Sequence, residues 1–216
     1  GGYWDTGSKN DYSFVADSLT EEGYTTVVLG YRLVPTVTFP EYVKDLALAV
    51  KWTVTNIAEY GGNQERIFLM SHSAGAHIGA LVSFDERYLQ RLELPLNTLD
   101  GFIGLAGPYD FLPVAPDDVR SVAALGNPAT YAETQPINFV DRNDPPAFIG
   151  YTLADKTVNP NNSIRFAEKI REVGGDVEEH SYNRVDHITI LGSLARVSRF
   201  FNEAILKDIT TFLESH

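Results

Sequence analysis

The 216-residue sequence contains no cysteine. Disulfide bridges, thiolate metal sites and a cysteine nucleophile are therefore excluded together. The sequence also lacks an apolar run of the roughly 20 residues that a membrane-spanning helix requires, so we expect no membrane span. It has no H-E-x-x-H pair, no G-x-x-x-x-G-K loop and no glycine-rich dinucleotide loop. We therefore expect neither a metal ion nor a cofactor.

Basic residues are scarce as well. Seventeen Lys and Arg stand against 29 Asp and Glu, which gives a formal charge of −12. Nucleic acids and anionic membrane surfaces would be repelled by this charge, so neither is expected as a partner. With 44% hydrophobic residues, the chain is long enough to bury one sizeable core. We expect a single domain over residues 1–216.

Two hydrophobic periodicities alternate along the chain. Short apolar or β-branched runs predict strands at residues 24–31, 66–70, 101–106, 146–151 and 177–182. Apolar residues spaced three and four apart predict helices at residues 11–22, 41–60, 73–84, 162–173 and 193–213. Because strands and helices alternate, the strands should be parallel and covered by helices on both faces. The sequence thus predicts an α/β fold.

One stretch interrupts this alternation. Residues 108–145 are rich in proline and carry only a weak helical signal, around residues 117–125. Excursions of this length inside a compact domain usually serve a function, so we interpret residues 108–145 as a candidate lid or cap over a site. An irregular surface loop is the alternative interpretation.

The segment M-S-H-S-A-G-A-H places Ser73 directly between a predicted strand and a predicted helix. A serine on such a sharp turn projects from the carboxyl edge of the sheet, as in the G-x-S-x-G nucleophile elbow. Ser71 replaces the first glycine of that motif, but it is also small. The start of the helix offers unpaired N–H groups and a positive dipole where an oxyanion would form. We predict that Ser73 is a catalytic nucleophile.

A serine hydroxyl needs a base to remove its proton, and position selects His187 among the five histidines. His187 lies in the loop after the last predicted strand, which returns it to the edge of the sheet that carries Ser73. Asp155 follows the preceding strand, which gives the chain order serine, aspartate, histidine. Asp186 is a rival for the acid, although adjacent side chains on an extended loop point apart. Asp144 is a weaker rival because it comes before its strand.

The chain opens with Gly1-Gly2-Tyr3-Trp4, and it contains GLAGPYD at residues 104–110 and ADKTV at residues 154–158. Together with the Ser73 turn and the His187 loop, these segments resemble the α/β-hydrolase esterases of the carboxylesterase and kynurenine-formamidase-like group. The oxyanion loop of that family reads His-Gly-Gly-x-Trp, and residues 1–4 resemble it without its histidine. The likeness covers nearly the whole chain.

The resemblance implies an α/β-hydrolase fold and a serine esterase that acts through an acyl-enzyme on short acyl esters or amides. Activity as an arylformamidase on a kynurenine precursor is one alternative, and a non-catalytic binding module that keeps the fold is another. The backbone N–H groups of Gly2, Tyr3 and Ala74 are implied to form the oxyanion hole. The residues expected to contact a small-molecule substrate are Trp4, His72 and Tyr109.

In this fold, the strand that leads into the oxyanion loop lies between the strands predicted at residues 24–31 and 66–70. The sequence contains no such strand. Its two neighbours would then face each other with unpaired backbone N–H and C=O groups, which cost free energy when buried. We therefore expect these residues to be part of a longer protein with further N-terminal strands. Otherwise, we expect a neighbouring strand or a partner chain to fill the gap.

Overall fold

The computed structural model describes residues 1–216. Its sheet has four parallel strands in the order β1-β2-β3-β4. The strands are β1 (Phe68–His72), β2 (Gly101–Leu105), β3 (Ala147–Tyr151) and β4 (Val177–Ser181). Four of the five predicted strands are therefore confirmed close to their predicted positions. All four carboxyl ends meet at one edge of the sheet, because the strands are parallel.

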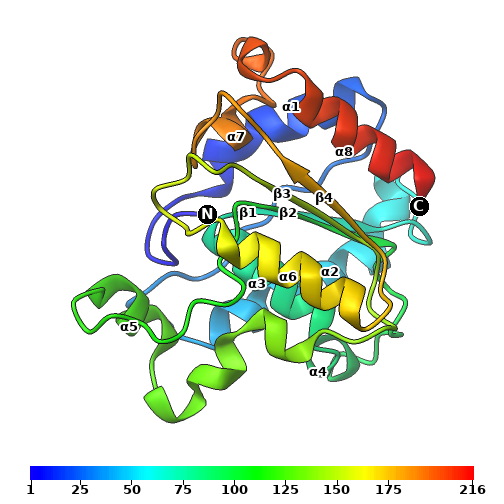
Figure 1. Cartoon of the computed structure of the whole chain (residues 1–216). Helices are drawn as coiled ribbons and strands as arrows, with labels where there is room; N and C mark the ends of the chain where they lie inside the picture. Colours follow the sequence, from blue (N-terminus) through cyan, green and yellow to red (C-terminus); the bar gives the residue numbers. More distant parts are fainter.

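Helices cover both faces of this sheet, as the alternation of strands and helices predicted. In Figure 1, α1, α7 and α8 lie on one side of the sheet, and α2, α3 and α6 lie on the other. The α-helices are α1 (Ser13–Glu21), α2 (Glu41–Asn56), α3 (Ala74–Phe84), α4 (Arg87–Gln90), α5 (Val119–Leu125), α6 (Asn161–Glu172), α7 (Thr189–Gly192) and α8 (Ala204–Ser215). The 3-10 helices are Lys9–Tyr12, Ile57–Tyr60, Pro128–Thr134, Pro136–Phe139 and Arg199–Phe201.

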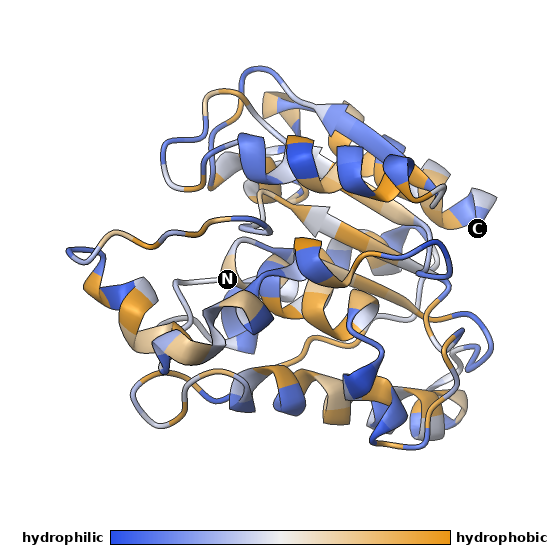
Figure 2. Cartoon of the chain, turned by 60° about the horizontal axis from the view of Figure 1, so that its bottom comes forward, coloured by the Kyte–Doolittle hydropathy of each residue, from blue (hydrophilic) through white to orange (hydrophobic).

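Apolar side chains fill the layers on both sides of the sheet. Phe148 of β3 packs with Leu19 of α1 and Phe212 of α8 on one side. Ile78 of α3 packs with Val43 of α2 on the other. Figure 2 shows hydrophilic residues gathered on outer helix surfaces and on β4, while the inner strands are pale or orange. Hydrophilic residues on an edge strand discourage pairing with another chain, which suits the position of β4.

The strand predicted at residues 24–31 does not form. These residues have no sheet hydrogen bonds, and no strand pairs with them. A groove of about 1120 Å³ is lined both by residues 24–33 and by residues 66–72, which include β1. A run with high β propensity becomes a strand only when a neighbour pairs with its N–H and C=O groups. No strand of the sheet has shifted into the groove to supply that neighbour.

The prediction of one long helix at residues 193–213 is also wrong for the first half of that range. The chain forms the short α7, an irregular stretch and then α8. Ser193 and Ser198 donate side-chain hydrogen bonds to carbonyls of the preceding turns, and Asn202 accepts the N–H of Ala204 at the start of α8. Such side-chain bonds compete with helix continuation and favour caps and turns. No helix of the structure is long and apolar enough to cross a bilayer.

Candidate active site

Ser73 occupies the sharp turn between β1 and α3. Its backbone has φ 56° and ψ −129°, a conformation that costs a non-glycine residue about 1–3 kcal/mol. Its N–H donates to Leu105 O at 2.9 Å, and its carbonyl oxygen accepts the N–H of His77 at 3.1 Å. The sheet and the helix thus hold the turn from both sides. The hydroxyl is presented at the carboxyl edge of the sheet as a result.

Close packing of β1 against α3 explains how Ser71 is tolerated in place of the glycine of the elbow motif. A Cβ placed on Gly79 would lie 2.4 Å from Ser71 Oγ, much closer than atoms can approach. Gly79 lies on α3, on the surface that faces β1. The elbow motif has a glycine at position 71, which leaves room for the helix. Here Gly79 of the helix leaves that room instead, so the Ser71 side chain fits.

Ser73, His187 and Asp155 form a continuous row of hydrogen bonds. The Ser73 hydroxyl lies 2.8 Å from His187 Nε2, and His187 Nδ1 lies 2.7 Å from Asp155 Oδ2. All three residues are buried. The other oxygen of Asp155 accepts the N–H groups of Thr157 and Val158 at 2.8 and 2.9 Å. The structure thus brings together three residues that are far apart in the chain.

The charge state of Asp155 determines how this row is used. Burial opposes ionisation of the carboxyl, but the hydrogen bonds from His187, Val158 and Thr157 outweigh it and lower the pKa of Asp155. An ionised Asp155 can only accept, so His187 Nδ1 carries the proton. His187 Nε2 is then free to accept the proton of the Ser73 hydroxyl.

Neither rival aspartate hydrogen-bonds to His187. Asp186 Oδ1 accepts the N–H groups of Ile188 and Thr189, so this carboxylate caps the start of α7. Those hydrogen bonds lower the pKa of Asp186. Asp144 accepts the N–H of Asp141, and burial raises the pKa of Asp144 to about 7. Both carboxyl groups accept hydrogen bonds from backbone N–H groups of their own loops.

His72 does not line the cavity beside Ser73, which corrects our expectation that it contacts substrate. It is buried, and its Nε2–H donates to the carbonyl oxygen of His187 at 2.7 Å. Burial and the neighbouring His187 lower the pKa of His72 to about 3, so its ring is neutral at physiological pH. Its hydrogen bond to the backbone of His187 supports the loop that carries the base, and its ring lines the groove beside β1 instead.

The N-terminal loop has an unusual backbone. Gly2, Tyr3 and Trp4 all have positive φ, at 103°, 52° and 62°. The N–H groups of Asp5 and Thr6 donate to Gly2 O at 3.2 and 3.0 Å and close the turn. A Cβ on Gly2 would lie 2.4 Å from Thr6 O, which explains the need for glycine there.

Three backbone donors of the N-terminal loop and of the start of α3 are uncommitted, although Gly2 does not line the cavity beside Ser73. The N–H groups of Gly2, Tyr3 and Ala74 donate to no other group of the chain. Tyr3, Ser73 and Ala74 line the same cavity. Free N–H groups beside a nucleophile, one of them at a helix N-terminus, can bind an oxyanion.

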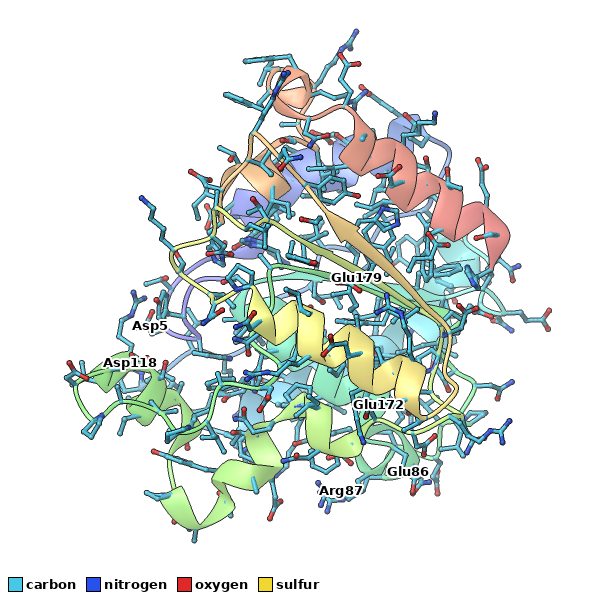
Figure 3. The ribbon with its side chains drawn as sticks, viewed as in Figure 1. Asp5, Glu86, Arg87, Asp118, Glu172 and Glu179 are labelled. Atoms are coloured by element: carbon cyan, nitrogen blue, oxygen red, sulfur yellow. The ribbon has the colours of Figure 1, made fainter.

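The cavity beside Ser73 has a volume of about 360 Å³. Residues 108–121 contribute much of its wall, and they belong to the proline-rich excursion. Arg120 of α5 forms an ion pair with Asp5, which ties this wall to the N-terminal loop. In Figure 3, Asp5 and Asp118 lie at the same end of the molecule, next to α5. Sequence reasoning missed several polar residues of the wall: Asp118, Ser121, Asn159, Asn162 and Arg165.

Two of these missed residues shape the wall. Asn162 Oδ1 accepts the N–H groups of Tyr109 and Asp110, and Arg165 forms an ion pair with Asp110 at 2.9 Å. Their position shortly after the Asp155 turn was the only signal that could have indicated them. No group of three or more His, Cys, Asp or Glu side chains is placed to hold a metal ion.

Of the aromatic residues expected to contact substrate, Trp4 lines the cavity and Tyr109 does not. Tyr109 is fully buried, and its ring stacks on Phe166 with centroids 4.4 Å apart. A Cβ on Gly104 would lie 2.2 Å from the Tyr109 hydroxyl oxygen, and a Cβ on Gly107 would lie 2.4 Å from the Tyr109 ring. The two glycines therefore let this ring sink into the core, away from the site.

The sequence of the chain is similar to those of known proteins. The profile of the BD-FAE family matches residues 1–170. Esterase LipC of Mycobacterium tuberculosis is 27% identical over 189 residues, which cover 80% of this chain and 47% of LipC. The chain spans less than half the length of LipC and of two other curated relatives that it matches.

Solved structures share the arrangement of the sheet and its helices. EstE1, a thermostable carboxylesterase from a metagenomic library, superposes with a TM-score of 0.83 at 19% identity, over 99% of this chain and 77% of its own. The acetyl ester-xyloside bifunctional hydrolase of Caldicellulosiruptor lactoaceticus superposes with a TM-score of 0.81 at 21% identity, over 98% of this chain and 80% of its own. At this level of identity the likeness shows the fold alone.

Proposed function

The chain belongs to the BD-FAE family of α/β-hydrolase esterases, and from this we propose that the protein is a serine hydrolase that cleaves short-chain carboxylic esters. The family and fold predicted from the sequence are thereby confirmed. We assign the nucleophile to Ser73, the base to His187 and the acid to Asp155. The observation that supports this assignment is the unbroken row of hydrogen bonds through these three side chains, which ends on a strained turn in a cavity wall.

The proposed reaction proceeds through an acyl-enzyme. Ser73 Oγ forms a bond to the ester carbonyl carbon while its proton passes to His187 Nε2. The carbonyl oxygen becomes an oxyanion, which the free N–H groups of Gly2, Tyr3 and Ala74 would stabilise. His187 then gives the proton to the departing alcohol, and the C–O bond to that alcohol breaks. Water attacks the acyl-enzyme by the same route, which releases the acid and restores Ser73.

Replacement of the nucleophile tests this proposal. Ser73→Ala should abolish hydrolysis of a short p-nitrophenyl ester, because no other hydroxyl bonds to His187. Ser71→Ala, which changes the serine two residues earlier in β1, should stay active and serves as the matched control. A fluorophosphonate probe should modify the wild-type protein once, on Ser73. Undiminished turnover by Ser73→Ala would overturn the assignment, and a wild type that neither hydrolyses esters nor reacts with the probe would indicate a binding module.

The cavity wall favours one alternative substrate class. Trp4 and Phe111 both line the cavity, with ring centroids 6.1 Å apart in a stacked arrangement. These rings suit an aryl group, as in an arylformamide. A series of p-nitrophenyl esters of increasing acyl length, measured beside N-formylkynurenine, separates the two activities. A higher kcat/KM for the formamide than for every ester would replace the esterase proposal with arylformamidase activity.

We also propose that residues 108–145 act as a cap. The contribution of residues 108–121 to the cavity wall supports this interpretation over that of a plain surface loop. A shortened or altered wall would then change the preferred acyl length more than the rate of attack on the smallest ester.

A further inference from the structure

His77 is a buried histidine with no part in the proposed proton transfers. It lies on α3, one turn after Ser73, and none of its surface is exposed. Both of its ring nitrogens are nevertheless hydrogen-bonded. Trp4 Nε1–H donates to His77 Nδ1 at 3.1 Å, and His77 Nε2–H donates to Thr134 O at 2.6 Å.

These partners permit only one form of the ring. An indole N–H can only donate and a carbonyl oxygen can only accept, so Nδ1 must be bare and Nε2 must carry the proton. Burial lowers the pKa of His77 to about 4, which keeps this neutral form at physiological pH. Protonation of Nδ1 would remove the acceptor that holds Trp4.

The two hydrogen bonds join three parts of the molecule. Trp4 belongs to the N-terminal loop with the free N–H groups, His77 to the helix that follows the nucleophile, and Thr134 to the excursion at residues 108–145. Phe111 packs against both rings, stacked on Trp4 and edge-on to His77 with centroids 5.6 Å apart. A backbone bond from Val34 N–H to Trp4 O, at 3.0 Å, supports the loop from its other side.

We propose that His77 is a positioning residue, which holds Trp4 and thereby fixes the N–H groups of Gly2 and Tyr3 relative to Ser73. This inference rests on the proposed function, because it assigns those N–H groups to the oxyanion. The hydrogen bond between His77 and Trp4 acts on these N–H groups at short range, since Tyr3 directly precedes Trp4 and the loop is a single tight turn. An oxyanion gains from donors only when they are held in place before the charge develops.

Two tryptophan replacements test the hydrogen bond between His77 and Trp4 through activity. Trp4→Phe keeps an aromatic ring but removes the donor, and it should lower kcat about 10- to 100-fold while KM changes less than about threefold. Trp52→Phe makes the same change on the exposed side of α2 and should leave kcat unaltered. The double variant Trp4→Phe/His77→Leu should lose no more than the worse single variant, because both remove one interaction. If the losses in kcat of the two single variants multiplied in the double variant, the hydrogen bond between Trp4 and His77 would not be the interaction that matters, and the proposal would be overturned.

Fluorescence tests the same contact without catalysis. The chain has two tryptophans, so Trp52→Phe leaves Trp4 as the sole emitter. Trp4 is buried, and its emission should move to longer wavelength when His77→Leu frees the loop. His77→Gln keeps one acceptor and one donor, and it should restore most of the original emission and kcat if His77→Leu folds poorly. Unchanged emission in folded His77→Leu would refute the positioning role, whether or not the protein hydrolyses esters. If His77→Leu does not fold, a shift of the emission of folded His77→Gln to longer wavelength would refute it.

Discussion

The two oxygens of Asp155 accept hydrogen bonds from different groups. This difference predicts the effect on catalysis of replacing one oxygen by an NH₂ group. Oδ1 is held by the N–H groups of Thr157 and Val158, and Oδ2 faces His187 Nδ1. In Asp155→Asn the amide oxygen must stay with the two N–H donors, so the NH₂ group turns towards His187. It would donate to Nδ1, which moves the proton to Nε2 and removes the acceptor of the Ser73 hydroxyl.

We therefore expect Asp155→Asn to lower kcat by about 10³- to 10⁴-fold with little change in fold. Asp186→Asn is the matched control, because its amide oxygen can still cap α7 and it lies next to His187. Steady-state hydrolysis of a p-nitrophenyl ester gives the rates, and thermal unfolding verifies the fold. If the two variants were equally active, Asp155 would not orient the base.

Ser73, Asp155 and His187 could be selected from the sequence because parallel strands bring their carboxyl ends to one edge. Each residue follows a strand, so the order of strands and helices was enough to predict that they meet. The expectations for His72 and Tyr109 failed because they depended on where a side chain turns. The pocket that buries Tyr109 is made by Gly104 and Gly107, and such local space is invisible to periodicity.

Among the elements, the contact between β1 and α3 offers a test of how the turn is supported. Ala has a higher helix propensity than Gly by about 1 kcal/mol, so Gly79→Ala would stabilise an isolated helix. Here the new methyl group would meet Ser71 Oγ at 2.4 Å and the Phe102 ring at 3.0 Å. We expect Gly79→Ala to destabilise the protein by about 1–3 kcal/mol.

Removal of the opposing side chain should relieve part of this cost. Ser71→Gly/Gly79→Ala should be more stable than the sum of the single changes predicts, by about 0.5–3 kcal/mol. Urea unfolding of the four proteins of this cycle measures the coupling. Strict additivity would show that Gly79 is not paired with Ser71 and that the helix accommodates the methyl group by moving.

Two elements also show which features of the fold the sequence patterns do not predict. The runs that became β1 to β4 have partners on at least one side, and the equally β-prone run at residues 24–31 has none. Its residues instead line the groove beside β1. Likewise, the apolar spacing at residues 193–213 indicated one helix, although serine and asparagine side chains divide it. Propensity predicts what a segment favours, and hydrogen-bond partners determine what it becomes.

At the scale of the whole molecule, the buried imidazoles make stability depend on pH. The pKa values of His72 and His77 are lowered by burial to about 3 and about 4, from an ordinary value of 6.5. Below pH 6.5 the unfolded chain therefore binds protons that the folded chain does not, so the folded state loses stability as the pH falls. The slope approaches about 1.4 kcal/mol per pH unit for each histidine, or nearly 3 kcal/mol for the two.

Urea unfolding at pH 7.5, 6.5, 5.5 and 5.0 should show this loss. Asp155 acts at lower pH, because its lowered pKa gives stability that is present above about pH 3.9 and disappears only below it. Asp144 acts in the opposite direction, because burial raises its pKa to about 7 and the folded chain then binds a proton that the unfolded chain does not. It offsets the slope of about one histidine between pH 6.5 and 5, so a net loss of stability remains. His77→Gln should make the profile nearly flat between pH 6.5 and 5, since His72 and Asp144 then oppose each other. A wild-type free energy of unfolding that stays constant from pH 7.5 to 5.0 would mean that at least one of His72 and His77 accepts a proton within the folded protein.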